Sequence, residues 1–201
     1  MLKTTTQIIA KEGWKPIIIT LIVLFFCWLL SWKFIGFLAF VFLLSLLYFY
    51  YNPERIAQDI SQDVILAPID GIITHIENQE DSLLITIKKP ICFCGMIRMP
   101  LNGMAKKLYH ISGLANAQES TGERVCLEFM GSKTCISLIL YPKICLRNLF
   151  IYFCDSKFRE GERIGFFLKG MAKLQLPKNV EVKVSIGDKI LAGSSIMGYI
   201  R

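Results

Sequence analysis

Apolar residues are unevenly distributed along the chain, and their distribution divides it into two parts. Between Pro16 and Tyr51 the only charged residue is Lys33. Beyond Asn52 charged residues recur throughout, and the apolar positions fall into short runs. This pattern predicts an apolar N-terminal segment followed by a globular domain with a hydrophobic core of its own.

The apolar segment, residues 16–51, is too long for a single membrane crossing. As one helix its 36 residues would extend ~54 Å, against ~30 Å for the hydrocarbon core of a bilayer. A polar interruption at Ser31–Lys33 divides it into pieces 16–32 and 34–51. We therefore predict a transmembrane helical hairpin. A cleaved signal peptide is the alternative, but the run continues into Tyr48–Tyr51 rather than into a small-residue cleavage site.

Charge predicts the orientation of this hairpin. Lys3, Lys11 and Lys15 in the segment 1–15 favour a cytoplasmic amino terminus. Two crossings return the chain to the same side, so we place the domain over residues 52–201 on the cytoplasmic face of the cell inner membrane. The net charge of +7 favours contact with anionic membrane lipids. The chain has no dense run of Lys and Arg, so we expect no nucleic-acid partner.

The seven cysteines show no spacing typical of a disulfide framework. Most lie in apolar, strand-like runs, where free cysteine packs as a small core residue. Their odd number favours a reducing compartment, in agreement with a cytoplasmic domain. Cys92 and Cys94 would point to one face of a strand and could begin a metal site, but no second pair with zinc spacing follows. We predict core packing for both thiols and no metal.

The domain over residues 52–201 is predicted to be mainly β. It lacks a long apolar period of 3.6 residues, and glycine, asparagine, aspartate and proline separate its short β-prone runs. These runs are Gly71–Ile76, Leu83–Ile87, Val125–Phe129, Thr134–Leu140, Leu149–Phe153, Lys173–Leu176 and Val180–Val184.

A partial internal repeat occupies the last third of the chain. Residues 158–167 and 184–200 each contain a strand, a glycine–acid pair typical of a tight reversal, and a second strand. Together with Ala67–Gly71, these units resemble the interlocked hairpins of biotinyl and lipoyl carrier domains. A carrier needs its modified lysine at a hairpin tip between methionines. Met171-Ala172-Lys173 lacks that frame, so a carrier function is the weaker interpretation.

Several motifs occur in the order found in one enzyme family. Lys11–Trp14 precedes the apolar segment, Tyr50–Arg55 follows it, and Ala67–Gly71 and Gly161–Gly165 come later. This order resembles the short, membrane-anchored bacterial phosphatidylserine decarboxylases, in which the second and third segments read Phe-Phe-Arg-Asp-Pro-Glu-Arg and Ser-Pro-Ala-Asp-Gly. The resemblance also includes Gly170, Leu176-Pro177, Gly187-Asp188 and Ala192-Gly193. It covers nearly the whole chain and is weakest between residues 90 and 155.

The resemblance implies a chemistry that depends on three residues. In the family, a precursor cleaves itself between a glycine and a serine, and the serine becomes an amino-terminal pyruvoyl group. The ketone of this group forms a Schiff base with the substrate amine and accepts electrons during decarboxylation. An aspartate and a histidine assist, because a serine hydroxyl needs a positioned base to act as a nucleophile.

Two of the three positions can be compared through short flanking motifs. The aspartate corresponds to Asp70, which is present. The histidine begins a His-Val-Asn-Arg-x-Pro segment in the family. Anchoring that segment on Pro100 and Gly103 retains Arg98 but places Gly95 where the histidine belongs.

The third position is the one that decides the chemistry. The family's Phe-Gly-Ser-Arg segment corresponds to a stretch in which Met171 follows Gly170, the cleavage-site glycine. Methionine has no hydroxyl to attack a carbonyl, so the resemblance implies that no pyruvoyl cofactor forms here. Cleavage at Gly193-Ser194 or Gly131-Ser132 is the alternative. The first pair stands seven residues from the end of the chain, and the second lacks matching flanks.

The remaining polar candidates also have structural interpretations. The pair Asp70-Gly71 makes a turn whatever the domain does. We expect Arg55 to lie near lipid phosphates at the membrane surface. The only histidines are His75 and His110, and we interpret His110 as an ordinary surface or loop residue.

The leading hypothesis is therefore a catalytically inactive, membrane-attached relative of the decarboxylases that acts in phospholipid (phosphatidylethanolamine) metabolism. It would bind membrane lipids, or pair with an active paralogue or with a second copy of itself. A divergent decarboxylase that uses another serine is one alternative. A membrane-tethered β domain that docks a partner is another.

Overall fold

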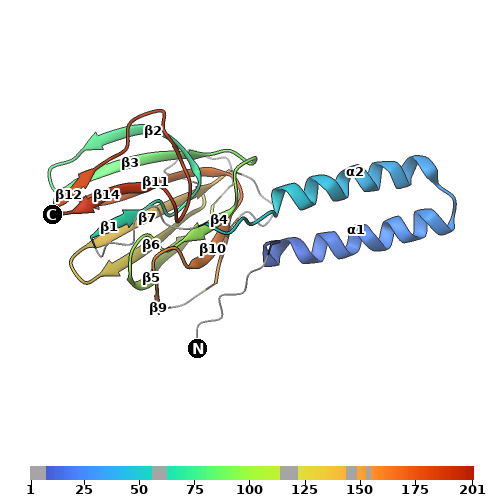
Figure 1. The fold of residues 1–201 in the computed structure, drawn as a ribbon, viewed down its shortest axis with the longest axis horizontal. Helices are drawn as coiled ribbons and strands as arrows, with labels where there is room; N and C mark the ends of the chain where they lie inside the picture. The colour runs from blue at the N-terminus through green and yellow to red at the C-terminus, as the bar shows by residue number, and fades with distance from the viewer. Residues whose placement is uncertain (1–7, 56–62, 114–121, 144–148, 153–154) are drawn as a thin grey trace. The chain divides into compact units, whose positions relative to one another are not determined.

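The computed structural model describes residues 8–55, 63–113, 122–143, 149–152 and 155–201 (Figure 1). The chain divides into two compact units, one ending at Glu54 and the other beginning at Arg55. The first unit is helical and the second is built of strands.

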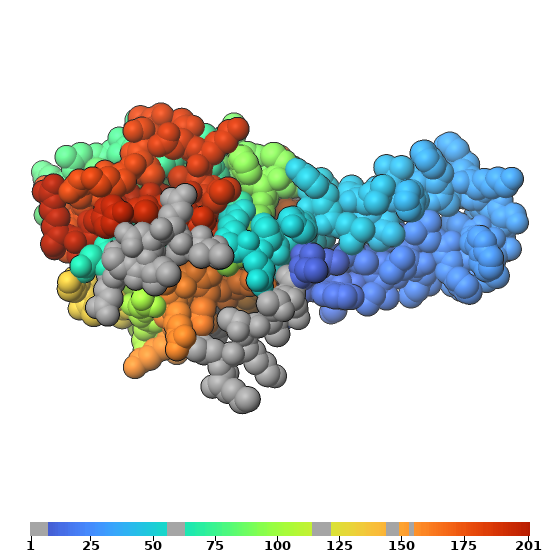
Figure 2. Space-filling model, in the orientation of Figure 1, coloured from blue at the N-terminus to red at the C-terminus, as the bar shows by residue number. Residues whose placement is uncertain are grey.

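The helical unit is an antiparallel hairpin of α1 (Lys11–Leu29) and α2 (Lys33–Phe49). The connection is tight because Ser31 adopts a left-handed conformation with φ of 55°, and the Trp32 backbone N–H donates to the Cys27 carbonyl at 2.9 Å. The helix break predicted at Ser31–Lys33 is thus found there. The space-filling view shows the two helices in contact along their length (Figure 2).

The two ends of the hairpin are joined at its base by backbone hydrogen bonds. The Ala10 N–H donates to the Tyr50 carbonyl and the Asn52 N–H to the Ile8 carbonyl, both at 2.8 Å. A Cβ on Gly13 would meet the Tyr50 ring at 2.6 Å, so this approach requires glycine. The motifs Lys11–Trp14 and Tyr50–Arg55, far apart in sequence, therefore meet at the hairpin base.

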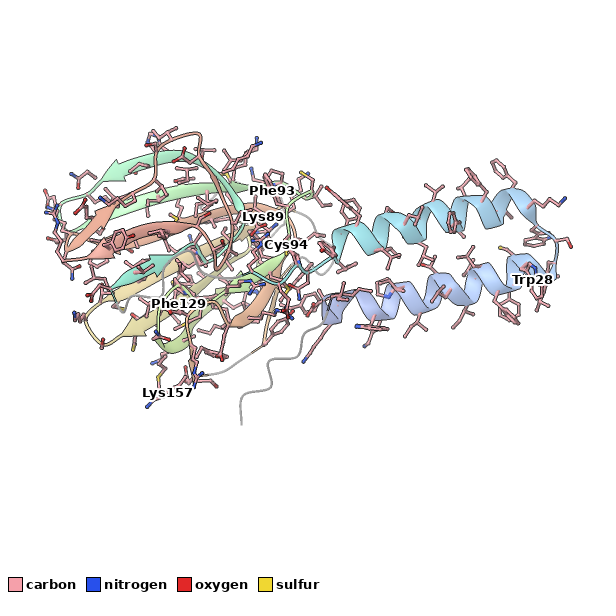
Figure 3. All side chains as sticks on the ribbon, in the orientation of Figure 1. Trp28, Lys89, Phe93, Cys94, Phe129 and Lys157 are labelled. Carbon is pink, nitrogen blue, oxygen red and sulfur yellow. The ribbon has the colours of Figure 1, made fainter. Side chains whose placement is uncertain are left out.

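Large apolar side chains are exposed on the helical unit. Trp28, which is labelled in Figure 3, is 75% exposed, for example, and Phe34 is 77% exposed. By length and composition α1 is long and apolar enough to cross a membrane, whereas α2 has 17 residues and is a shorter apolar helix. Apolar surface of this extent on two packed helices is typical of segments that lie in lipid.

Among the described residues, the strands of the second unit form three antiparallel sheets. The largest has, in spatial order, β13 (Lys189–Ile190), β2 (Gly71–Asn78), β3 (Ser82–Lys89), β11 (Gly170–Pro177), β7 (Cys135–Pro142), β6 (Arg124–Gly131), β5 (Gly103–Ile111) and β9 (Ser156–Phe158). The second contains β1 (Val64–Leu66), β14 (Ile196–Ile200) and β12 (Val180–Val182). The third contains β4 (Met96–Arg98), β10 (Arg163–Phe167) and β8 (Leu149–Ile151).

The prediction of a mainly β domain is confirmed. Each of the seven predicted runs contains a strand. The sequence reading did not identify β5, the nine-residue strand Gly103–Ile111, because most of its residues are exposed and polar and apolar positions do not alternate regularly.

The two glycine–acid turns of the internal repeat have the same hydrogen-bonding pattern. The Arg159 N–H donates to the Glu162 carboxylate at 3.0 Å, and the Ser185 N–H donates to the Asp188 carboxylate at 2.7 Å. Gly161 and Gly187 between them have φ of 74° and 94°, which favours glycine. The sequence repeat is therefore a repeat of turn geometry.

We predict that the central strand β11 carries much of the stability of the β unit. Replacing the fully buried Leu174 by alanine should lower the free energy of unfolding by about 2–5 kcal/mol, through lost burial and a residual cavity. The same change at Leu108, which is 45% exposed, is the matched control and should alter it by less than about 0.5 kcal/mol. Denaturant titration of the full chain in detergent, followed by circular dichroism, measures both. Equal effects would contradict the assignment of β11 to the core.

Candidate functional site

Three neighbouring strands bring the sequence-predicted positions to one end of the large sheet. Lys89, the last residue of β3, is paired directly with Gly170, the first residue of β11. Ile72 of β2 is paired with Lys88 of β3, so Asp70 lies just beyond the same end of the sheet. Gly170, Met171 and Asp70 are thus collected in one region although 100 residues separate the first from the last.

Asp70 is the buried acid of this region and has three donors around it. Its side chain receives both terminal nitrogens of Arg55, with Nη2–Oδ2 at 2.7 Å and a short Nη1–Oδ1 contact. The Ala192 N–H donates to Oδ1 at 2.8 Å. Asp70 is 1% exposed, so this pairing compensates the removal of its charge from water.

The segment Ala67–Asp70 is also held by its backbone. The Ala67 N–H donates to the Ser195 carbonyl, and the Ala67 carbonyl accepts from the Gly193 N–H, both at 2.8 Å. The Pro68 carbonyl accepts from the Arg98 N–H at 2.8 Å. Strand β4 and the turn before β14 therefore fix the position of the Asp70 side chain.

The burial of charged side chains around Asp70 shifts the pKa values of two arginines. Burial would lower the pKa of Arg55, but the hydrogen bonds and charge of Asp70 outweigh it and raise that pKa above its usual range. The Arg98 guanidinium donates to the Gly161 carbonyl at 3.1 Å. Burial lowers the pKa of Arg98, and the positive charges of Arg163 and Arg55 lower it further.

Lys89 is the residue of this region that sequence reasoning missed. Its side chain is buried, and Nζ donates to the Phe93 carbonyl at 3.0 Å (Figure 3). Burial lowers the pKa of Lys89 to about 8, although the negative charge of Asp70 opposes the shift. The alternation Ile85, Ile87, Lys89 was the available signal, since it places one of two adjacent lysines on the buried face.

Core packing of both Cys92 and Cys94 was a wrong prediction. Strand β3 ends at Lys89 before Pro90, so the two thiols lie in the connection to β4 rather than on a strand face. Cys92 is exposed and Cys94 half-buried. Burial raises the pKa of Cys94. The charges of Asp70, Arg55 and Lys89 also act on its thiol. The predicted core location does hold for Cys27 and Cys126. Cys145 and Cys154 lie outside the described residues.

Gly95, the position assigned to the missing histidine, has no room for a side chain. A Cβ there would meet the Phe166 ring at 2.3–2.9 Å. Its carbonyl accepts from the Phe167 N–H at 2.7 Å, which fixes the backbone against β10. A histidine at this position would require the Phe166 ring to move.

Gly170 and Met171 lie inside a central strand. Met171 is half-buried and is paired with Lys88 on one side and Tyr141 on the other. A Cβ on Gly170 would meet the Tyr141 carbonyl oxygen at 2.2 Å, so glycine is required by this close approach. Lys173 is in the same strand and not at a hairpin tip, which argues against the carrier interpretation.

The other candidate residues lie as follows. Arg55 is 13% exposed at its side chain and is engaged by Asp70, and its contact with lipid remains a prediction. His110 is exposed on β5, where its Nε2 lies 3.0 Å from Glu123.

Ser194 belongs to the turn that contacts Asp70 through Ala192, whereas Ser132 lies in the turn between β6 and β7. Among the described residues, no group of three His, Cys, Asp or Glu side chains is arranged to hold a metal.

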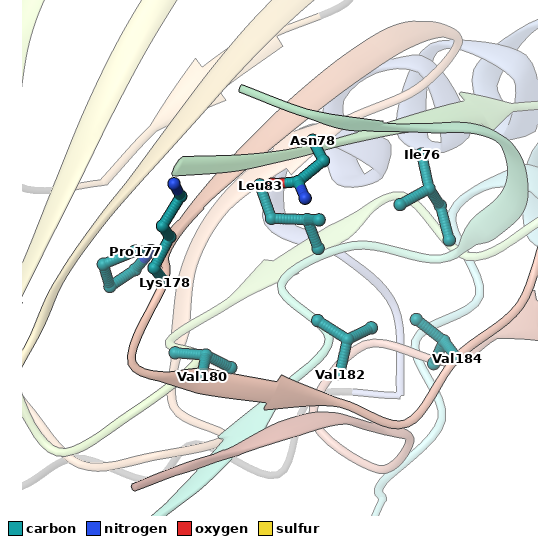
Figure 4. Close-up of a pocket in the computed structure, with 8 residues that line it drawn as sticks. All are labelled: Ile76, Asn78, Leu83, Pro177, Lys178, Val180, Val182 and Val184. Atoms are coloured by element: carbon teal, nitrogen blue, oxygen red, sulfur yellow. The ribbon is translucent and has the colours of Figure 1, made fainter. Parts of the chain in front are cut away.

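A groove of about 590 Å³ lies at the other end of β11 (Figure 4). Valine, isoleucine and leucine side chains provide most of its wall, and Pro177 ends β11 there, whereas Gly170 begins it. The lining residues are Ile76, Asn78, Leu83, Pro177, Lys178, Val180, Val182 and Val184. The groove is therefore separate from the polar region around Asp70 and Lys89, which is the candidate site.

Comparison with known proteins supplies relatives of nearly the same length. The chain is 25% identical to a phosphatidylserine decarboxylase proenzyme of Geotalea uraniireducens over 216 aligned residues, which cover 96% of each protein. It is 27% identical to that of Polynucleobacter asymbioticus, over 96% of this chain and 95% of the relative. A Wolbachia proenzyme is 26% identical over 96% of this chain and 91% of its own length. These similarities over nearly the whole chain support membership of the phosphatidylserine decarboxylase family.

Two further comparisons found nothing: no family model matches the chain, and no solved structure matches it. Within the phosphatidylserine decarboxylase family, the aligned lengths mean that both the helical unit and the β unit have counterparts in the relatives. The candidate site at the end of β2, β3 and β11 therefore lies within the aligned part of the chain.

We predict that the Asp70–Arg55 pair is a strong structural contact. Asp70→Asn should lower the free energy of unfolding by about 3–5 kcal/mol, because it leaves a buried guanidinium without its counter-charge. The exposed pair Asp63–Lys133, at 2.7 Å, provides the control, and Asp63→Asn should change it by at most about 1 kcal/mol. Denaturant titration of the two variants distinguishes them, and similar losses would refute the special role of Asp70.

Lys89 should give the protein an unusual dependence of stability on pH. Between about pH 8 and 10.5 the unfolded chain binds more protons than the folded one, so stability should rise with pH, by up to roughly 3 kcal/mol. Lys89→Met removes the titrating group and should flatten this rise, whereas Lys88→Met, at the exposed neighbouring position, should preserve it. Thermal unfolding at a series of pH values measures the slope. An unchanged slope in Lys89→Met would overturn the assignment.

Proposed function

We propose that this protein is a membrane-attached member of the phosphatidylserine decarboxylase family that does not generate a pyruvoyl group. The observation that carries the proposal is Met171, which follows Gly170 in β11. Formation of a pyruvoyl group from this position requires a side-chain oxygen next to the glycine carbonyl. A thioether has no O–H to attack that carbonyl and no oxygen to form the intermediate ester.

The surroundings of Met171 agree with an intact peptide bond at this place. β3 and β7 pair with β11 on its two sides through both Gly170 and Met171. The residues present therefore do not fit the family's cofactor, and Asp70 is occupied by Arg55 and the Ala192 N–H. No step of decarboxylation is assigned to these residues.

The proposed role is in phospholipid metabolism at the inner membrane. The relatives are named phosphatidylserine decarboxylase proenzymes, and the exposed apolar surface of α1 and α2 supports attachment to lipid. The β unit would face the cytoplasm, where it binds lipid or pairs with an active paralogue or a second copy. The net charge of +7 favours the surface of an anionic membrane.

A second candidate is an active decarboxylase that cleaves at Gly193-Ser194. It is favoured by one observation, the contact of the preceding Ala192 N–H with Asp70 at 2.8 Å. The turn is held by other hydrogen bonds, however: the Ser194 N–H donates to the Leu191 carbonyl at 3.1 Å, and the Leu191 N–H donates to Ser195 Oγ at 2.9 Å. Cleavage there would also remove β14, which pairs with both β1 and β12.

The proposal predicts one uncut polypeptide. Intact mass spectrometry of the full chain purified from membranes should give a single species near 22.9 kDa. Expression in cells that lack phosphatidylserine decarboxylase should not restore phosphatidylethanolamine, because no ketone is available to react with the substrate amine. Two fragments, one with an amino-terminal pyruvoyl group, would overturn the proposal.

Two variants identify the cause of either result. Met171→Ser restores a hydroxyl beside Gly170, and cleavage of this variant alone would assign the missing activity to that atom. If the natural chain is cut instead, Ser194→Ala decides the second candidate, because it should abolish a cut at Gly193-Ser194 and leave any other cut in place.

A further inference from the structure

The groove at the far end of β11 has two aliphatic walls. Val180, Val182 and Val184 alternate in β12 and just beyond it, so their side chains face the same way. They lie along one wall in Figure 4, and Ile76 and Leu83 lie along the other. The groove volume of about 590 Å³ is within the ~300–1,000 Å³ typical of small-molecule sites, which are also lined mainly by apolar side chains.

The groove is open because, among the described residues, no strand closes this side of the β unit. β12 is the last strand of its sheet and pairs with β14 alone. β2 is paired with β13 only at Gly71 and Ile72, so its other half, which contains Ile76, has no described strand on that side. The five aliphatic wall residues pack against the hydrophobic core but keep part of their surface exposed. Removing that surface from water favours an apolar occupant.

One end of the groove carries a positive charge. Figure 4 shows Lys178 at one end and Val184 at the other. In the part of the chain that the structure describes, Lys178 forms no ion pair with a carboxylate. Glu181, the nearest acid along the chain, is engaged by Lys183 and Arg201. A complementary ligand is therefore apolar along most of its length and negatively charged at one end.

We propose that this groove binds a single-chain fatty acid, with the carboxylate at Lys178 and the acyl chain along the valines. From Val180 to Val184 an extended backbone advances ~13 Å, which sets the length of chain that the wall can cover. A peptide would bring an N–H and a C=O with every residue, for which aliphatic side chains offer no partner, whereas an acyl chain brings neither. The proposal does not rest on the proposed function, because the groove lies at the opposite end of β11 from Met171.

Photolabelling tests the proposal on the full chain in phosphatidylcholine nanodiscs. The probe is dodecanoic acid with a diazirine near its methyl end. Peptide mapping should find at least about fivefold more label on residues 76–83 and 180–184 than on residues 108–111, where Leu108 and Ile111 are exposed outside the groove. An excess of unlabelled dodecanoic acid should remove the label from the groove. Equal label on the three segments would overturn the proposal.

Two variants test the two ends of the ligand. Val182→Phe fills the groove and should lower the label on residues 180–184 by at least about fivefold. Ile186→Phe, at a position that is 60% exposed and outside the lining, is the matched control and should leave the label within about twofold. Lys178→Glu should lower labelling by the acid roughly threefold or more, because repulsion replaces attraction. Labelling by the alcohol of the same chain length should stay within about twofold in Lys178→Glu.

The comparison of segments within the natural chain and the surface variant Lys178→Glu keep the test decisive if Val182→Phe does not fold. Equal losses for the acid and the alcohol in Lys178→Glu would overturn the assignment of the carboxylate to this lysine. Groove label that disappears when two copies share a nanodisc would assign the groove to a second copy, and would overturn the fatty-acid proposal.

Discussion

The β unit depends on the burial of one carboxylate. Asp70 is removed from water, and a buried charge is tolerated only when partners surround it. Those partners come from distant parts of the chain, Arg55 from 15 residues before and Ala192 from 122 residues after. The same short segment binds β4 through Pro68 and the 191–195 turn through Ala67. The segment Ala67–Asp70 therefore fixes the start of β2, the Arg55 side chain and the turn before β14.

Because the Asp70–Arg55 pair is needed for folding, the presence of Asp70 does not by itself indicate catalysis. A family aspartate would ordinarily be taken as a sign of retained activity. Here its replacement would leave the Arg55 guanidinium buried without a counter-charge, so folding alone requires an acid at this position. Met171 is subject to no such requirement, because a half-buried strand residue can change its side chain while β11 keeps its backbone pairing. The fold thus depends on the side chain of Asp70, whereas it does not depend on the side chain at position 171. The fold can therefore persist when residue 171 changes.

Sequence patterns predicted those features that depend on local periodicity. The helix break, the seven β-prone runs and the two glycine–acid turns follow from rules that act over a few residues. Strand β5 was missed because its exposed residues give no clear alternation. The pairing of Asp70 with Arg55 could not be predicted, since the same arginine was equally suited to lipid phosphates. Lys89 was overlooked although its alternation with Ile85 and Ile87 places it on the buried face, because lysine is rarely buried without a partner of opposite charge.

The register of the pairing between β3 and β11 also fixes which residues meet at the candidate site. Gly170 lies directly opposite Lys89, and the Tyr141 carbonyl oxygen and the Phe167 ring fill the space where its Cβ would be. Gly95 adds no side chain either, because the Phe166 ring fills the space where its Cβ would be. Lys89 is buried at this end of the sheet, and the charges of Asp70 and Arg55 act both on its amine and on the Cys94 thiol. The polar groups at this end of the sheet are therefore held together by long-range strand pairing and by the Asp70–Arg55 ion pair rather than by any single local motif.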